Sequence, residues 1–325
     1  MPLSRVETIP ANNKRILPGG HYNCDYFCSS GKRKNATQLR IAMDRKKMNK
    51  EDLQRIVRRY LKKLKNCIKE IAPGFDAEML HQFRVEFKKL RSFLRILSAV
   101  NNSHKTGLSK KLKQAYHIAG TIRDLKLQKK RVSDAVRPHH KKPVEYLRLL
   151  QEKVKNSQRE LLPILAKNPV QKTEKKTMTM LPEKYGVEAF RRYSEEKYRA
   201  LETIVLPGTI SDDQMHNIRK ILKDLFFSNK NIAKWTNWNP VPGPWKIKDQ
   251  SYLNNMLEEL GNFQDRRTAL TFLKPDWLTT LNSENREFLI DLKREWIKDK
   301  SILKRGLVRK LTTEFLPAMN HGHHK

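Results

Sequence analysis

The chain has 325 residues, of which 68 are Lys or Arg and 34 are Asp or Glu, giving a formal charge of +34. Such an excess opposes compaction through self-repulsion, and an anionic partner would relieve it, whereas solubility alone would be served as well by acidic residues. Cys24, Cys28 and Cys67 are too few for a disulfide framework and fit a reducing compartment. Signal-peptide and membrane-spanning apolar runs are absent from the sequence, so we expect a cytoplasmic protein.

Residues 1–42 mix Pro, Gly, Asn and Ser without a period, which predicts a disordered or loosely packed leader. His21, Cys24 and Cys28 lie in this leader, but closed structural zinc sites use four ligands, so we predict no metal site. Residues 317–325 are predicted to be a tail.

From about residue 50 onward, apolar residues recur at helical spacing and strand signals are nearly absent, which predicts an all-α fold. The amphipathic segments lie near 50–71, 76–100, 107–136, 143–168, 184–205, 211–230, 248–273 and 283–316. The polar stretch from Asn168 to Lys176 is predicted to break the chain between the fourth and fifth segments. We therefore expect one domain at 43–316, with a first bundle at about 50–168 and a second at about 184–316.

Two short motifs recur in the same order in both halves. His81-Gln-Phe-Arg84 opens the second helix, and His216-Asn-Ile-Arg219 opens the sixth. The third helix contains Gly120-Thr-Ile-Arg-Asp124, and the seventh contains Gly261-Asn-Phe-Gln-Asp265. Ordered matches at similar offsets argue for an internal duplication, which predicts two pseudo-symmetric four-helix bundles.

The second helix separates its apolar and basic side chains at 100° per residue. Its predicted core face is Phe83, Phe87, Leu90, Leu94 and Leu97. Its basic stripe is His81, Arg84, Lys88, Arg91 and Arg95. Like charges at such spacings repel by a few tenths of a kcal/mol per pair, so folding alone would not select them. An extended anion along the helix would turn this repulsion into attraction.

Basic rows also occur on other helices. The sixth helix places on one side His216, Arg219, Lys220, Lys223 and Lys230. The first helix and the last, where Lys300 and Lys304 align, have rows that an ordinary solvated face explains equally well. Each histidine could instead be a cap or a core residue, although both lie in a basic stripe. A phosphate beside such a histidine would raise its pKa.

At these motifs the chain resembles one family, the CHAD proteins (conserved histidine α-helical domain), over about residues 45–316. The segment from His81 to Arg91, which includes Lys88 and Lys89, is similar to the family's His-x-x-Arg-Val-x-x-basic-basic-Leu-Arg motif. Gly120 to Asp124 resembles its Gly-x-x-Arg-Asp element. In the second half, His216–Lys223 resembles the family's His-x-x-Arg-Lys-x-x-Lys motif, and Leu260–Asp265 resembles its Leu-Gly-x-x-x-Asp motif.

The resemblance implies two antiparallel four-helix bundles with a basic groove between them. It also implies binding of inorganic polyphosphate, association with polyphosphate granules, and no catalysis by the domain itself. Asp224 and Phe226 stand where the family tends to have basic residues, and Gln264 stands where a histidine is common. We therefore expect the second half to contribute less to binding than the first.

Enzyme, nucleic-acid and membrane functions are the alternatives to polyphosphate binding. The sequence has no Glu-x-Glu-x-Lys triphosphatase signature, P-loop or nucleophile elbow, so we expect neither catalysis nor a cofactor. The main alternative is a nucleic-acid binder, because any phosphate backbone would match the basic surface. Single-strand binders add aromatic platforms; here Trp235, Trp238 and Trp245 could stack a base or pack over a bundle end. Membrane binding is not expected, because the bundles need the apolar stripes.

The predicted site combines the basic rows of several helices, with arginines as forked donors and lysines as point charges. The predicted polyphosphate-binding residues are His81, Arg84, Lys88, Lys89, Arg91, Arg95, Arg123, His216, Arg219, Lys220, Lys223, Arg266, Lys300 and Lys304. Asp124 and Asp265 are expected to orient neighbouring Arg or Lys side chains; the alternative for each is an ordinary ion pair within its helix. The sequence carries no signal for an oligomeric state.

Overall fold

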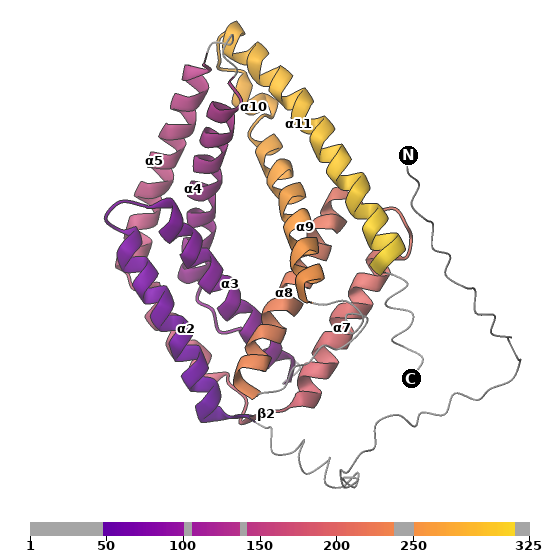
Figure 1. Ribbon diagram of the computed structural model, residues 1–325. Helices are drawn as coiled ribbons and strands as arrows, with labels where there is room; N and C mark the ends of the chain where they lie inside the picture. The colour runs from indigo at the N-terminus through magenta and orange to yellow at the C-terminus, as the bar shows by residue number, and fades with distance from the viewer. Residues whose placement is uncertain (1–47, 101–105, 137–141, 237–249, 316–325) are drawn as a thin grey trace, which may run out of the picture. The chain divides into compact units, whose positions relative to one another are not determined.

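The computed structural model describes residues 48–100, 106–136, 142–236 and 250–315, which all belong to the compact unit Met43–Lys325 (Figure 1). The predicted leader at 1–42, the predicted tail at 317–325, and Trp238 and Trp245 lie outside these residues. The described part of the chain is almost entirely helical, as predicted. None of its helices has an apolar stretch long enough to cross a bilayer.

The first half of the described chain contains five helices and a short strand. These elements are β1 (Met48–Asn49), α2 (Lys50–Ile71), α3 (Ala77–Val100), α4 (Lys110–Asp134), α5 (Val144–Ala166) and α6 (Pro169–Thr179). Polar side chains cap two of the helices: Asn49 Oδ1 accepts from Asp52 N at the start of α2, and Ser109 Oγ accepts from Leu112 N at the start of α4. Figure 1 shows α2 beside α3 and α4 beside α5, and these pairs make extensive contacts.

The second half continues with another short strand and further helices. They are β2 (Lys184–Tyr185), α7 (Val187–Val205), α8 (Asp212–Thr236), α9 (Gln250–Thr271), α10 (Pro275–Leu278) and α11 (Ser283–Lys310), followed by a π-helical turn at Leu311–Phe315. The two strands pair antiparallel, with Met48 opposite Tyr185. This short pair ties the start of α2 to the segment before α7.

The predicted break at Asn168 to Lys176 was wrong, because this stretch lies almost entirely within helix α6. Asn168 adopts a left-handed φ of 43°, and Pro169 then begins the helix at a position that suits proline. One polar residue of the stretch is not solvated: Thr173 is fully buried, and its Oγ1 accepts from Ser109 N at 3.2 Å. This long-range hydrogen bond packs α6 against the cap of α4, and composition alone does not predict it.

The apolar core forms two clusters. The larger contains most buried side chains of α2–α6, and it also includes Leu273, which follows α9, and Leu289, Leu292 and Trp296 of α11. The smaller gathers buried residues of α7, α8, α9 and α11, Leu307 among them. The core therefore does not divide between the predicted bundles 50–168 and 184–316. The reason is the length of α11, whose 28 residues span roughly 42 Å and reach both clusters.

The apolar face predicted for the second helix is confirmed in α3. All five predicted residues are buried, with exposed fractions of 3% or less: Phe83, Phe87, Leu90, Leu94 and Leu97. Full burial of each such side chain stabilises the fold by about 1.5–3 kcal/mol. Because this face is fixed in the core, the basic stripe of α3 must point in a different direction.

Candidate functional site

The site begins where α3 and α8 approach each other through two small residues. Ser92 and Ser228 are both fully buried, and their Oγ atoms lie 3.3 Å apart. Ser92 Oγ also donates to the backbone carbonyl of Asp224 at 3.1 Å. This close approach brings the basic stripes of α3 and α8 to the same cavity, which α4 and α9 also line.

The cavity has a volume of about 540 Å³ and a strongly cationic wall. Its lysines and arginines are Arg84, Lys88, Arg91, Arg95, Arg123, Arg219, Lys220 and Lys223. Its carboxylates are Asp124, Asp224 and Asp265. A cleft with such an excess of one charge concentrates counter-ions of the other sign. The structure thus brings together most of the predicted residues.

Arg84 is held firmly by α4. Its Nη1 donates to the carbonyl of Tyr116 at 3.0 Å, and its Cζ lies 4.6 Å from the centre of the Tyr116 ring. The guanidinium passes so close to Gly120 that a Cβ there would lie 1.9 Å from Nη1. The glycine of the first Gly-x-x-Arg-Asp motif therefore makes room for the arginine of the preceding His-x-x-Arg motif.

Arg219 and Gly261 repeat this arrangement more loosely. A Cβ at Gly261 would lie 3.6 Å from Arg219 Nη2, which is an ordinary contact distance. The Nε atom of Arg219 is buried and has no hydrogen-bond partner in the described part of the chain. Burial also lowers the pKa of Arg219. An unpartnered buried donor of this kind favours an anion within reach.

Lys88 and Lys223 are the two most perturbed cations of the cavity. Burial, together with the nearby Lys223 and arginines, lowers the pKa of Lys88 to about 7. Burial and neighbouring arginines likewise lower the pKa of Lys223 to about 8. Among the described residues, no protein acceptor forms a hydrogen bond or ion pair with either ammonium group. Both are available to a ligand.

The two predicted histidines differ in position. His216 lines the cavity, and its Nδ1–H donates to Gln264 Oε1 at 2.7 Å. His81 is not among the lining residues, although Arg123 and Lys88 are close enough to act on it. Burial is the main cause that lowers the pKa of both histidines. Gln264, the predicted departure from the family pattern, thus orients a site histidine.

The two predicted orienting carboxylates lie in the wall of the cavity. Asp265 Oδ2 lies 3.4 Å from Arg131 Nη2, which connects α9 to α4. Asp124 lies near Arg123, with 3.9 Å between Oδ1 and Nη1, and burial raises the pKa of Asp124. The sequence prediction missed Arg131, which follows Asp124 by two helical turns on the same side of α4.

Besides His81, four predicted binding residues do not line the cavity, and a carboxylate partners each of these four. Lys89 pairs with the buried Glu86 at 2.7 Å. Arg266 pairs with Asp299 at 2.9 Å. Lys300 and Lys304 lie 2.7 and 2.8 Å from the two carboxylate oxygens of Asp212. The structure thus separates these cations from the others.

Five other lining residues were not predicted: Tyr116, His117, Thr121, Phe227 and Thr268. His117 precedes Gly120 by three residues and Asp124 by seven, so helical spacing from the motif could have identified it. Tyr116 and Phe227 are aromatic, and the sequence has no spacing from a motif that would predict a place for them in the cavity wall. Metal-binding groups of three or more His, Cys, Asp or Glu are absent from the described ranges.

Comparisons with known proteins bear on the family and the fold of the chain. The CHAD domain pattern matches residues 55–229, which is more than half of the chain. The crystal structure of the CHAD domain from the plant Ricinus communis is similar in fold, with a TM-score of 0.56 and 17% sequence identity over 79% of this chain and 91% of that chain. None of the curated proteins matches. The chain belongs to the CHAD domain family.

Proposed function

We propose that this protein binds inorganic polyphosphate in the cationic cavity without catalysing a reaction. The observation that carries the proposal is the state of Lys88 and Lys223, two partly buried ammonium groups that lie beside arginines and have no acceptor among the residues that the structure describes. Folding gains nothing from burying them in this way. A chain of phosphates would offset the cost, because it brings one negative charge per unit and many acceptor oxygens.

The position of these cations favours a bare phosphate chain over nucleic acid. A duplex carries its phosphates on the outside of a wide rod, which does not enter a cavity of about 540 Å³. Single strands are held by stacking bases on aromatic rings. Tyr116, however, already stacks on Phe87 at 4.2 Å and has the guanidiniums of Arg84 and Arg91 within 5.6 Å of its ring centre. Phe227 has Lys223 5.7 Å from its ring centre.

The carboxylates of the cavity support a role in binding alone. Asp224 pairs with Arg95, Asp265 with Arg131, and Asp124 lies beside Arg123. A general base must be positioned to take a proton from an attacking water, and these side chains are positioned toward cations instead. In the cell, such binding would place the protein at polyphosphate granules.

The first test is a competition assay at near-physiological salt. Labelled long-chain polyphosphate is challenged with duplex DNA, single-stranded RNA and tripolyphosphate, compared at equal phosphate concentration. Long-chain polyphosphate should bind most tightly, because affinity accumulates over neighbouring phosphates of one chain. Equal or stronger competition by either nucleic acid would make the cavity a generic phosphate surface and refute the proposal.

A matched pair of variants tests whether binding occurs in the cavity. Lys88→Met with Lys223→Met removes two positive charges from its wall, and Arg58→Met with Lys62→Met removes two from the exposed face of α2. The cavity variant should weaken long-chain binding by about 100-fold, at roughly 1.5 kcal/mol for each charged contact. It should also reduce the dependence of affinity on salt. Equal losses in the two variants would contradict a defined site.

A further inference from the structure

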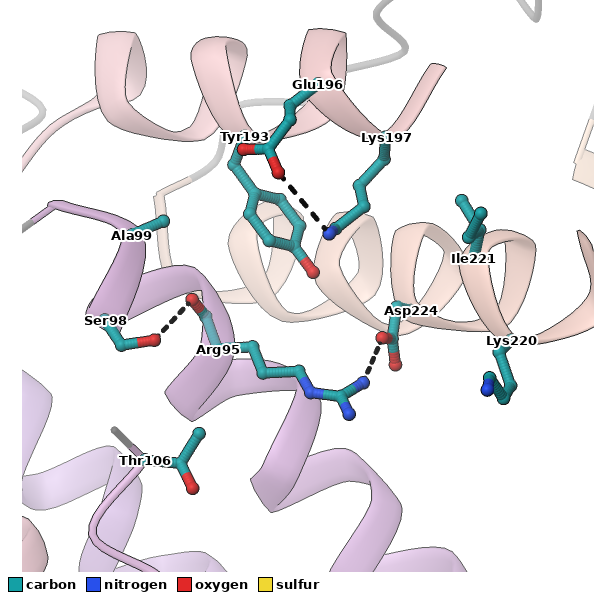
Figure 2. Close-up of a pocket in the computed structure, with 10 residues that line it drawn as sticks. All are labelled: Arg95, Ser98, Ala99, Thr106, Tyr193, Glu196, Lys197, Lys220, Ile221 and Asp224. Carbon is teal, nitrogen blue, oxygen red and sulfur yellow. Dashed lines mark hydrogen bonds and ion pairs between the residues drawn. The ribbon is translucent and has the colours of Figure 1, made fainter. Parts of the chain in front are cut away.

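A second cavity, of about 560 Å³, adjoins the first between α3, α7 and α8 (Figure 2). Arg95, Lys220 and Asp224 line both cavities. The side chains of Arg95 and Asp224 form an ion pair with each other. This pair therefore forms part of the wall that the two cavities share.

The position of the ion pair is fixed by the backbone around it. The carbonyl of Asp224 accepts hydrogen bonds from Ser92 Oγ at 3.1 Å and from Ser228 Oγ at 2.5 Å. Ser92 precedes Arg95 by nearly one helical turn, so the closest approach of α3 and α8 holds both partners of the pair. Their side chains are only partly exposed, at 41% for Arg95 and 16% for Asp224.

The second cavity has hydrogen-bond donors of its own. Lys197 lines only this cavity, and its contact with Glu196 is long, at 3.9 Å. The Tyr193 hydroxyl is buried beside Ser228, whose own hydroxyl donates to the carbonyl of Asp224, and within the described ranges it forms no other hydrogen bond. Burial and the nearby Asp224 raise the pKa of Tyr193, so the hydroxyl stays a donor at neutral pH. Figure 2 shows it directed from α7 toward the space between Lys197 and the Arg95–Asp224 pair.

We propose that Asp224 is an internal substitute for a ligand phosphate, and that long polyphosphate displaces it from Arg95 and continues into the second cavity. This inference rests on the proposed function. From Arg84 to Arg95, α3 rises roughly 16 Å, and three phosphates cover only part of that distance. A short chain therefore binds beside Lys88 and leaves the ion pair intact. A longer chain exchanges one anion for another at Arg95, and then meets Tyr193 and Lys197.

The test compares Asp224→Asn with Asp213→Asn. Asp213 lies on the same helix, is exposed, and lines neither cavity, so its variant controls for the loss of one negative charge. Asp224→Asn should raise the affinity for long-chain polyphosphate roughly tenfold, the size of one charged hydrogen bond. Its affinity for tripolyphosphate should rise less than about threefold, since screening weakens the effect of a distant charge. Asp213→Asn should change the affinity for either ligand by less than about threefold.

A second pair of variants tests the path beyond Arg95. Lys197→Gln should weaken binding of long chains about tenfold and leave tripolyphosphate unchanged. Arg192→Gln, on the exposed side of α7, should affect neither ligand. Melting curves check that each variant is folded.

Two results would overturn the inference while leaving the proposed function in place. One is an equal gain for both chain lengths in Asp224→Asn, and the other is equal behaviour of Lys197→Gln and Arg192→Gln. A wild-type protein that binds neither polyphosphate would instead overturn the proposed function, and the inference with it.

Discussion

The two sides of the cationic cavity hold the same motif in different states. On the α3–α4 side, Arg84 is fixed against Gly120 and the ring of Tyr116, and it donates to a backbone carbonyl. On the α8–α9 side, Arg219 lies farther from Gly261 and keeps a buried donor without a partner in the described residues. Arg84 is thus ordered by the protein itself, whereas Arg219 is left for an anion to complete; among the described residues, Arg91 of α3 shares this property, because its Nε is also buried without a partner. Because Arg84 is already held by the protein, it loses less freedom on binding than Arg219 does.

The largest expected difference between the two sides comes from adding one methyl group to the glycine of each. Gly120→Ala forces the Arg84 guanidinium away from α4, and should reduce polyphosphate affinity about tenfold or more through loss of a charged contact. Gly261→Ala meets only an ordinary contact, and should raise stability by about 0.5–1 kcal/mol through helix propensity with unchanged affinity. Calorimetric titration and melting measure both. Equal affinity losses would show that the two sides are equivalent.

The next largest effect should be on the free energy of unfolding, which the burial of Lys88 in the cavity lowers. Unfolding restores the ordinary pKa of Lys88, so the unfolded chain binds more protons between pH 7 and about 10.5, and stability rises with pH in that window. Lys88→Met should therefore stabilise the protein by about 2 kcal/mol at pH 7, with a gain that shrinks toward pH 10. Urea unfolding at several pH values measures this gain. The exposed Lys62→Met should show no such trend.

Binding should carry the opposite pH dependence. A phosphate chain requires Lys88 and Lys223 to be charged, and their pKa values of about 7 and 8 mean that both are increasingly neutral as the pH rises. Affinity should fall by tenfold or more from pH 7 to pH 9, because each lysine loses most of its charge over that range, and binding should be accompanied by proton uptake. Titration calorimetry in buffers of different ionisation enthalpy detects that uptake. A flat profile would mean that neither lysine contacts the ligand.

The smallest expected effect concerns the histidine of the second side. Gln264→Ala removes the acceptor that orients His216, and should weaken binding about threefold, the size of one neutral hydrogen bond. Gln82 of α3 donates to Glu86 at 3.4 Å rather than contacting a histidine, and it lines neither cavity, so Gln82→Ala is the matched control and should leave affinity unchanged. Equal losses would indicate that the His216 ring needs no orientation.

Local periodicity predicted most of the fold. The bounds of α2 and the buried face of α3 follow from helical spacing, which depends only on neighbours along the chain. Helix α6 was missed because its buried threonine is satisfied by Ser109, a residue distant in sequence. The shared core was missed for the same reason, since the length of α11 does not show which cluster each of its turns contacts.

The sequence predicted those parts of the candidate site that depend only on which residues share one face of a helix. The stripe of α3 and the motif of α8 both contribute to the cavity wall. Lys300 and Lys304 were included because they also form a row, but Asp212 of another helix pairs with both. The repeated glycines were recognised as a motif, while the reason for Gly120 became clear only from its distance to Arg84. Partners across helices decide which cations remain available.

Helix α11 has a consequence for how the molecule comes apart. Because it contributes Trp296 to one core cluster and Leu307 to the other, neither core can melt without withdrawing packing from its neighbour. The cavity walls come from helices that depend on both clusters. The cavity should therefore open only when both clusters unfold together, and not by local unfolding. Partial unfolding then cannot reduce the repulsion between the cations of the cavity.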